Sequence, residues 1–148
     1  MFKPRVYITR QIFPDALDLI EKSADLELWP EDEPPSPEQL REAMADVDGA
    51  IINVMDRIDA PLLDAAPKLK VLSQVAAGLD NIDVPEATKR ERMVGYTPGV
   101  LAKSTADLAF GLLLAVARRV VESDKWVREG NWKISHHPMF WLGAEVNG

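Results

Sequence analysis

Short apolar runs alternate with amphipathic stretches through the first hundred residues. Five runs predict strands, at residues 5–9, 25–29, 49–53, 70–74 and 93–96. Residues 25–29 alternate apolar and polar side chains, which is typical of an edge strand. Between the runs, helical spacing of apolar side chains predicts helices at residues 13–23, 37–45, 60–66 and 84–90, and Ser36 and Gln39 have the spacing of a capping box.

The regular alternation of strand and helix predicts the fold class. Helical connections between successive strands favour a parallel sheet with helices on both faces. Because such crossovers are right-handed, we expect an α/β, flavodoxin-like sheet of five strands in the order 2-1-3-4-5. A long apolar helix and an irregular arm should follow it.

The chain after Pro98 has a different pattern. We expect one helix from Ser104 to about Arg128, with the Ser104 hydroxyl capping the amide of Asp107. Residues 108–117 are apolar on every side, so that helix needs neighbours all round. Gly130 and Asn131 should end it, and an arm with little periodicity follows.

Composition narrows the classes of partner. The 148 residues have a net charge of −7, which would repel nucleic acid and an anionic membrane surface. There is no cysteine, so neither a disulfide framework nor a thiolate metal site is possible. No secretory segment is evident, and the longest apolar run is too short to cross a bilayer. We expect a cytoplasmic protein with no metal site.

Two segments after predicted strands are candidates for chemistry. Residues 76–83, Ala-Ala-Gly-Leu-Asp-Asn-Ile-Asp, contain small residues that let backbone amides approach a ligand, and such amides can hold a small carboxylate. Asp80 and Asn81 can fix this loop by bonding its backbone. Residues 53–56 follow the neighbouring strand and should lie beside it. A plain turn and a plain strand exit remain alternative interpretations of the two segments.

Other patterns are weaker. His136 and His137 have no carboxylate at ligand spacing, so an ordinary loop pair is favoured over a metal or acid–base site. Trp126, Trp132, Phe140 and Trp141 favour packing or subunit contacts in an acidic chain. The sequence contains no G-x-G-x-x-G, Walker or G-x-S-x-G motif.

Several stretches together resemble one family. In chain order they are residues 56–59, 66–71, 77–83, 86–90, 97–101, 105–110 and 112–115. Their order and spacing are similar to those of the NAD(P)-dependent D-2-hydroxyacid dehydrogenases, nearest the glyoxylate/hydroxypyruvate reductases. The resemblance implies a flavodoxin-like substrate-binding (catalytic) domain over residues 1–99. Residues 100–148 would form the interdomain and dimerisation helix with its arm.

The resemblance also implies an activity. The full protein would reduce small 2-oxo acids such as glyoxylate or hydroxypyruvate to D-2-hydroxy acids with NAD or NADP. The chain would end just before the dinucleotide motif, and the family's catalytic arginine, glutamate and histidine would lie beyond it. We therefore expect no catalytic residue, no bound cofactor and no activity in this piece alone.

Site residues follow position by position from the family's motifs. Ala76, Ala77 and Gly78 match the loop that binds the substrate carboxylate, and Val54 and Met55 match a second substrate wall. The remaining matches are peripheral, near the nicotinamide side of the cofactor: Leu101 and Thr105.

The resemblance further implies a homodimer, in which the long helix could be exchanged between copies. The sequence departs from the family pattern at three positions. Tyr96 replaces a usual asparagine, Glu91 a common turn glycine, and His136 a frequent tryptophan. Two other functions stay open: a stand-alone flavodoxin-like binding or scaffold module, and a dehydrogenase-like corepressor.

Overall fold

The computed structural model describes residues 3–134 and 137–146. Contacts divide the chain into two compact units, Met1–Val100 and Leu101–Gly148.

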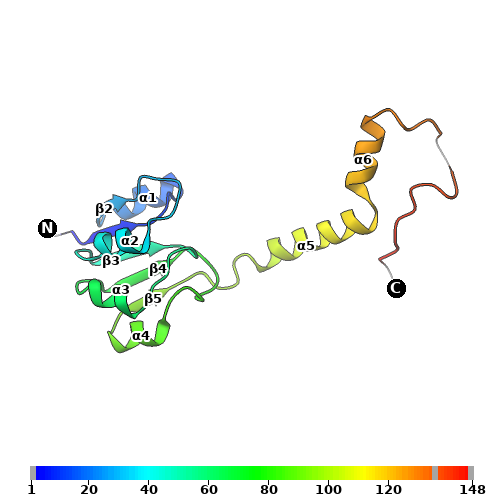
Figure 1. The fold of residues 1–148 in the computed structure, drawn as a ribbon. Helices are drawn as coiled ribbons and strands as arrows, with labels where there is room; N and C mark the ends of the chain where they lie inside the picture. Colours follow the sequence, from blue (N-terminus) through cyan, green and yellow to red (C-terminus); the bar gives the residue numbers. More distant parts are fainter. Residues whose placement is uncertain (1–2, 135–136, 147–148) are drawn as a thin grey trace. The chain divides into compact units, whose positions relative to one another are not determined.

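The first unit is built on a parallel sheet. Its strands are β1 (Arg5–Ile8), β2 (Asp25–Leu28), β3 (Gly49–Ile52), β4 (Val71–Gln74) and β5 (Met93–Gly95). They pair in the order β2-β1-β3-β4-β5, and every pair is parallel (Figure 1). The expected five-stranded sheet and its strand order are confirmed, with β2 at an edge.

Four helices connect these strands: α1 (Pro14–Glu21), α2 (Pro37–Met44), α3 (Ala60–Ala65) and α4 (Val84–Lys89). Each has proline in its first turn, where the missing amide hydrogen costs no helical bond. The capping box before α2 is confirmed, because Ser36 and Gln39 bond each other's backbone amides. Asp59 and Asp83 cap α3 and α4 without such a reciprocal bond, each accepting from an amide in the first turn.

The hydrophobic core lies on the side of the sheet covered by α2, α3 and α4. Met44, Leu63, Leu69 and Leu72 are among its fully buried side chains. Along β4, buried and exposed positions alternate, so Leu72 and Gln74 point into this core. The strands are thereby fixed relative to the loops that follow them.

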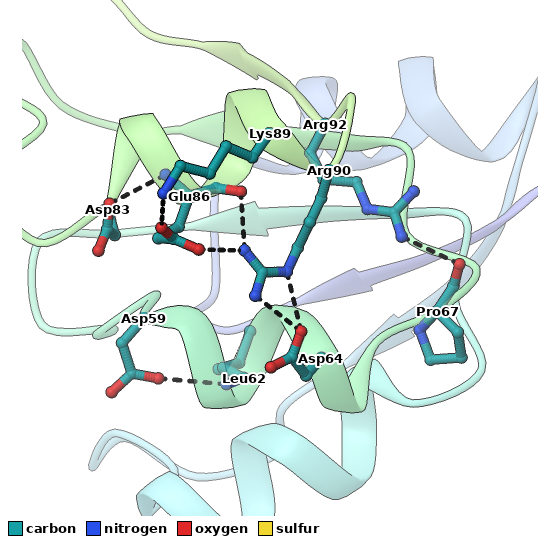
Figure 2. Close-up of polar contacts among 9 residues, drawn as sticks. All are labelled: Asp59, Leu62, Asp64, Pro67, Asp83, Glu86, Lys89, Arg90 and Arg92. Carbon is teal, nitrogen blue, oxygen red and sulfur yellow. Dashed lines mark hydrogen bonds and ion pairs between the residues drawn. The ribbon is translucent and has the colours of Figure 1, made fainter.

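An ion-pair clamp joins α3 to α4. Arg90 places its Nε atom 2.9 Å from an Asp64 carboxylate oxygen and its Nη2 atom 2.8 Å from the same oxygen. It also donates to Glu86, which Lys89 contacts from the other side (Figure 2). Arg92 donates to the Pro67 carbonyl at 3.1 Å. The two helices that follow the candidate loops are thus tied together.

The second unit contains two helices, α5 (Ala102–Ala117) and α6 (Val120–Arg128). The expectation of one helix from Ser104 to Arg128 is wrong, because Arg119 adopts a left-handed backbone with φ 55° and breaks the ladder. The Ser104 cap is also wrong, since Leu101 occupies the N-cap position and no side chain caps the helix. Gly130, with φ 72°, follows the end of α6 as expected.

The arm packs its aromatic side chains against α6. The Trp126 ring centroid lies 5.1 Å from that of Phe140 and 5.5 Å from that of Trp141. The Arg119 guanidinium lies 4.4 Å from the Trp141 ring centroid, within cation–π range. The expected packing is thus seen for Trp126, Phe140 and Trp141, whereas Trp132 is 59 % exposed. His136 lies outside the described residues. Among the described helices, none is long and apolar enough to cross a membrane.

Candidate functional site

Two loops meet at the carboxyl end of the sheet. One follows β3 and leads into α3, and the other follows β4 and leads into α4. They run side by side as a short parallel bridge, in which the Ile58 amide donates to the Asn81 carbonyl at 2.9 Å. The Asp83 amide donates in turn to the Ile58 carbonyl at 2.8 Å. The expectation that residues 53–56 lie beside residues 76–83 is confirmed.

The Asn81 side chain joins the two loops directly. Its amide nitrogen donates to the Asn53 carbonyl at 3.0 Å and to the Asp56 carbonyl at 2.7 Å. Its carbonyl oxygen accepts from the Gln74 side chain at 2.7 Å. Asn81 was expected to fix its own loop, but its amide nitrogen instead binds backbone carbonyls of the neighbouring loop.

Asp56 anchors the first loop in the interior. It is only 2 % exposed, and one carboxyl oxygen accepts from the Thr9 hydroxyl and, at 2.8 Å, from the Asn53 amide. Its other carboxyl oxygen is buried with no hydrogen-bond partner among the described residues. Asn53 in turn accepts from the Met55 amide at 2.8 Å, which shapes the turn at Val54 and Met55.

The second loop presents backbone amides. Within the described chain, the amides of Ala76, Ala77 and Gly78 donate to no protein acceptor. The Ala76 carbonyl accepts from the amide and the hydroxyl of Thr97, both at 3.0 Å, which fixes the start of the loop. Ala77 and Gly78 are exposed. Three adjacent free amides on a fixed backbone can bind an anion such as a carboxylate.

A groove of 460 Å³ is lined by residues of both loops. Val54 and Met55 are part of its wall, with exposed fractions of 58 % and 67 %. Its charged lining residues are Arg57, Asp59, Asp80 and Asp83. Ala76, Ala77 and Gly78 do not line this groove, so the two halves of the predicted site are neighbours on one sheet edge without sharing one cavity.

The candidate cofactor residues belong to the second unit. Leu101 precedes α5 and accepts from the Thr105 amide at 2.9 Å, and both residues are exposed. No phosphate-binding glycine loop accompanies them anywhere in the sequence. The residues present therefore do not fit a complete dinucleotide site, and the contribution of Leu101 and Thr105 stays a prediction.

Sequence reasoning gave no supporting role to the side chains of Thr9, Asp56 and Gln74, although Asp56 lies in the candidate segment 53–56. Each is a polar residue at or after the end of an apolar strand, and all three are buried, with exposed fractions of 0, 2 and 1 %. The sequence signal that could have indicated them is a polar residue at or just after the end of a buried strand. A buried polar side chain needs a hydrogen-bond partner, so such a residue is expected to bind a specific group.

Comparison with known proteins decides the family. Residues 6–143 match the model for the D-isomer specific 2-hydroxyacid dehydrogenase catalytic domain. The chain belongs to this family. The expected resemblance is thereby confirmed.

Curated members of the family resemble the chain along its whole length. A glyoxylate reductase of Korarchaeum cryptofilum is 51% identical over 146 residues, covering 99% of this chain and 44% of that protein. A glyoxylate reductase of Thermococcus litoralis is 50% identical, covering 99% of this chain and 45% of that protein. The chain thus spans less than half the length of the curated relatives it matches.

Solved structures of other proteins support the same assignment. A protein of Thermus thermophilus superposes with a TM-score of 0.84 at 41% identity, covering 97% of this chain and 46% of that one. An NADPH-dependent glyoxylate/hydroxypyruvate reductase of Sinorhizobium meliloti, solved with NADP and malonate, gives a TM-score of 0.73 at 27% identity. It covers 99% of this chain and 44% of that one.

Proposed function

We propose that this chain is the substrate-binding part of an oxidoreductase that reduces small 2-oxo acids to D-2-hydroxy acids with NAD or NADP. The observation that carries the proposal is the set of three unpartnered amides at Ala76, Ala77 and Gly78, in a member of this dehydrogenase family. Relatives named glyoxylate reductase make glyoxylate and hydroxypyruvate the first substrates to test.

The loop after β4 would bind the carboxylate of the substrate. Amide dipoles aimed at one point stabilise a negative charge without contributing a titratable group. Val54 and Met55 would supply an apolar wall next to it, which limits the size of the group attached to the oxo carbon. These residues bind and orient the substrate and transfer no proton themselves.

The hydride would come from a nicotinamide cofactor. The chain's own residues do not include the glycine-rich loop that binds the pyrophosphate of such a cofactor. The apolar helix α5 further supports a homodimer as the working assembly, because none of its side chains is buried within its own unit.

The proposal predicts the effect of Gly78→Val in the full-length protein. A side-chain carbon added at Gly78 would meet only an Asp80 carboxylate oxygen at 3.6 Å, so the fold should tolerate the change. The larger side chain would cover the free amides, and we expect the KM for the 2-oxo acid to rise by roughly tenfold or more. Steady-state kinetics with glyoxylate and hydroxypyruvate, using NADH and NADPH in turn, measure this.

Gly78→Ala is the matched control, because it adds one carbon to the same backbone and should raise KM less. A correctly folded Gly78→Val protein with unchanged KM would exclude the loop assignment. A wild-type protein that reduces no 2-oxo acid with either cofactor would instead favour a scaffold or corepressor function.

A further inference from the structure

Asn81 is the point at which the two candidate substrate loops are joined. Both of its amide hydrogens go to the loop after β3, at the Asn53 and Asp56 carbonyls. Its oxygen is held by Gln74 on β4, from which the other loop departs. One side chain is therefore hydrogen-bonded both to the loop after β3 and to the strand from which the other loop departs.

The partners of Asn81 are themselves fixed. Gln74 is 1 % exposed and ends β4 two residues before Ala76. Asp56 is 2 % exposed and is bound by Thr9, which directly follows β1. The result is a continuous hydrogen-bonded chain from the end of β1 to the end of β4. One Asp56 oxygen has no partner among the described residues, but each link of the chain is made, and buried hydrogen bonds fix the geometry of the groups that they join.

We propose that Asn81 is a positioning residue that sets how the apolar wall at Val54 and Met55 stands relative to the free amides at Ala76, Ala77 and Gly78. Asn81 makes no contact with substrate in this role; it acts through the two backbones that do. The inference rests on the proposed function, because positioning matters only if both loops bind one 2-oxo acid. Its loss should therefore weaken substrate binding more than folding or cofactor binding.

Only a primary amide satisfies the three contacts made by Asn81. Two carbonyls need donors and the Gln74 amide needs an acceptor, and asparagine supplies two donors and one acceptor on a short stem. An aspartate of the same shape would point an acceptor at two carbonyls. Asn81→Asp thus replaces two hydrogen bonds to backbone carbonyls by repulsion between oxygen atoms, with almost no change in side-chain volume.

The test is Asn81→Asp in the full-length protein. We expect KM for the 2-oxo acid to rise roughly 10- to 100-fold, since loop displacements near 1 Å have effects of this size. The KM for NADH or NADPH should stay unchanged. A purely structural role would lower the fraction of active enzyme, and hence kcat, without moving the KM for the 2-oxo acid.

The pH dependence gives a second readout. The introduced carboxyl would face the Asn53 and Asp56 carbonyls, with Asp56, Asp59, Asp80 and Asp83 as nearby acids and Arg57 as the nearby cation. These acids and the partial burial favour its neutral form, which can donate one hydrogen bond. The ratio of variant to wild-type KM should therefore shrink as the pH is lowered.

The control is Asn131→Asp, the same exchange at an exposed side chain in the other unit. Within the described part of the chain, the side-chain amide of Asn131 donates to Glu129 alone. It should leave KM and its pH dependence unchanged. If Asn81→Asp does not fold, Asn81→Ser is measured in the same way.

Three possible results would overturn the positioning role of Asn81, and they differ in what they imply for the proposed function. If the wild-type protein reduces no 2-oxo acid, the proposed function fails and the positioning role fails with it. If the wild type is active and a folded Asn81 variant keeps its KM, the positioning role alone is overturned. Loss of folding in both Asn81 variants would overturn it as well, because Asn81 would then be required for the fold itself.

Discussion

At the scale of single residues, Tyr7 shows what burial does to an ionisable group. Its side chain is 2 % exposed, and its hydroxyl has no hydrogen-bond partner among the described residues. Burial, and then the charges of Glu27 and Asp56, raise the pKa of Tyr7 to about 12. The phenol is therefore held neutral in the folded chain at pH values where an unfolded tyrosine ionises.

This raised pKa predicts a loss of stability at alkaline pH. Between pH 10 and about 12 the unfolded chain gives up the Tyr7 proton and the folded chain keeps it, so stability falls as pH rises. The full effect would be roughly 3 kcal/mol, from a rise of about two pKa units. Urea unfolding across this range measures it, and Tyr7→Phe should remove this part of the slope.

At neutral pH, Tyr7→Phe should leave the free energy of unfolding unchanged or raise it by about 1 kcal/mol, since it removes an unpartnered buried hydroxyl. Tyr96→Phe, at the one other tyrosine, is the exposed control. A loss of several kcal/mol in Tyr7→Phe would show that the hydroxyl has a partner.

At the scale of elements, α3 and α4 are short helices that ion pairs join to each other. The Glu86 carboxylate accepts from Lys89 and Arg90, and these bonds, with Lys89 the larger cause, hold the pKa of Glu86 below its ordinary value. Arg90 extends the contact to Asp64 on α3 (Figure 2). Each candidate loop leads into one of these helices. The ion-pair clamp therefore also fixes the positions at which the two loops end.

Glu86→Gln should lower the melting temperature at pH 7. A lowered carboxyl pKa contributes stability above its ordinary value, and this is lost as pH falls through the folded-state pKa. The difference in melting temperature from wild type should therefore shrink as the pH falls below the ordinary glutamate pKa. Thermal unfolding followed by circular dichroism from pH 3 to pH 7 measures it.

Glu42→Gln on α2 is the control, since Glu42 makes no ion pair within the described chain. If the melting temperature of Glu86→Gln stays below that of wild type at low pH, the loss of stability comes from lost packing and not from the lost charge.

At the scale of the whole molecule, the apolar surface of α5 is the main unexplained feature of the second unit. Leu108, Leu112 and Val116 lie at helical spacing and are 63 %, 57 % and 78 % exposed. Exposed apolar side chains of this size cost roughly 1.5–3 kcal/mol each relative to burial. Association with a second copy would cover them.

We expect the 148-residue chain to be a dimer, or to exchange α5 with a second copy. Light scattering across a dilution series should give about twice the 16.5 kDa chain mass at high micromolar concentration. Replacing Leu108 and Leu112 together by glutamine should shift the population toward monomer. A monodisperse 16.5 kDa species at high concentration would contradict the proposal.

Much of the first unit could be predicted from the sequence alone. The order of strands follows from the alternation of patterns, and right-handed crossovers leave few other arrangements. Local signals also sufficed where both partners are close in the chain, as at the Ser36 and Gln39 box. The resemblance of residues 77–83 to a known family also indicated the candidate site from the sequence.

The tertiary structure decided what depends on partners distant in the sequence. Ser104 has the residue type of a cap, but α5 begins at Ala102, and Arg119 breaks a pattern that reads as one helix. Asn81 could have bonded its own loop; it bonds Asn53 and Asp56 because β3 and β4 bring those carbonyls within 3.0 Å. Local pattern fixes which residues can form a hydrogen bond, and only the packed sheet determines which partner is in reach.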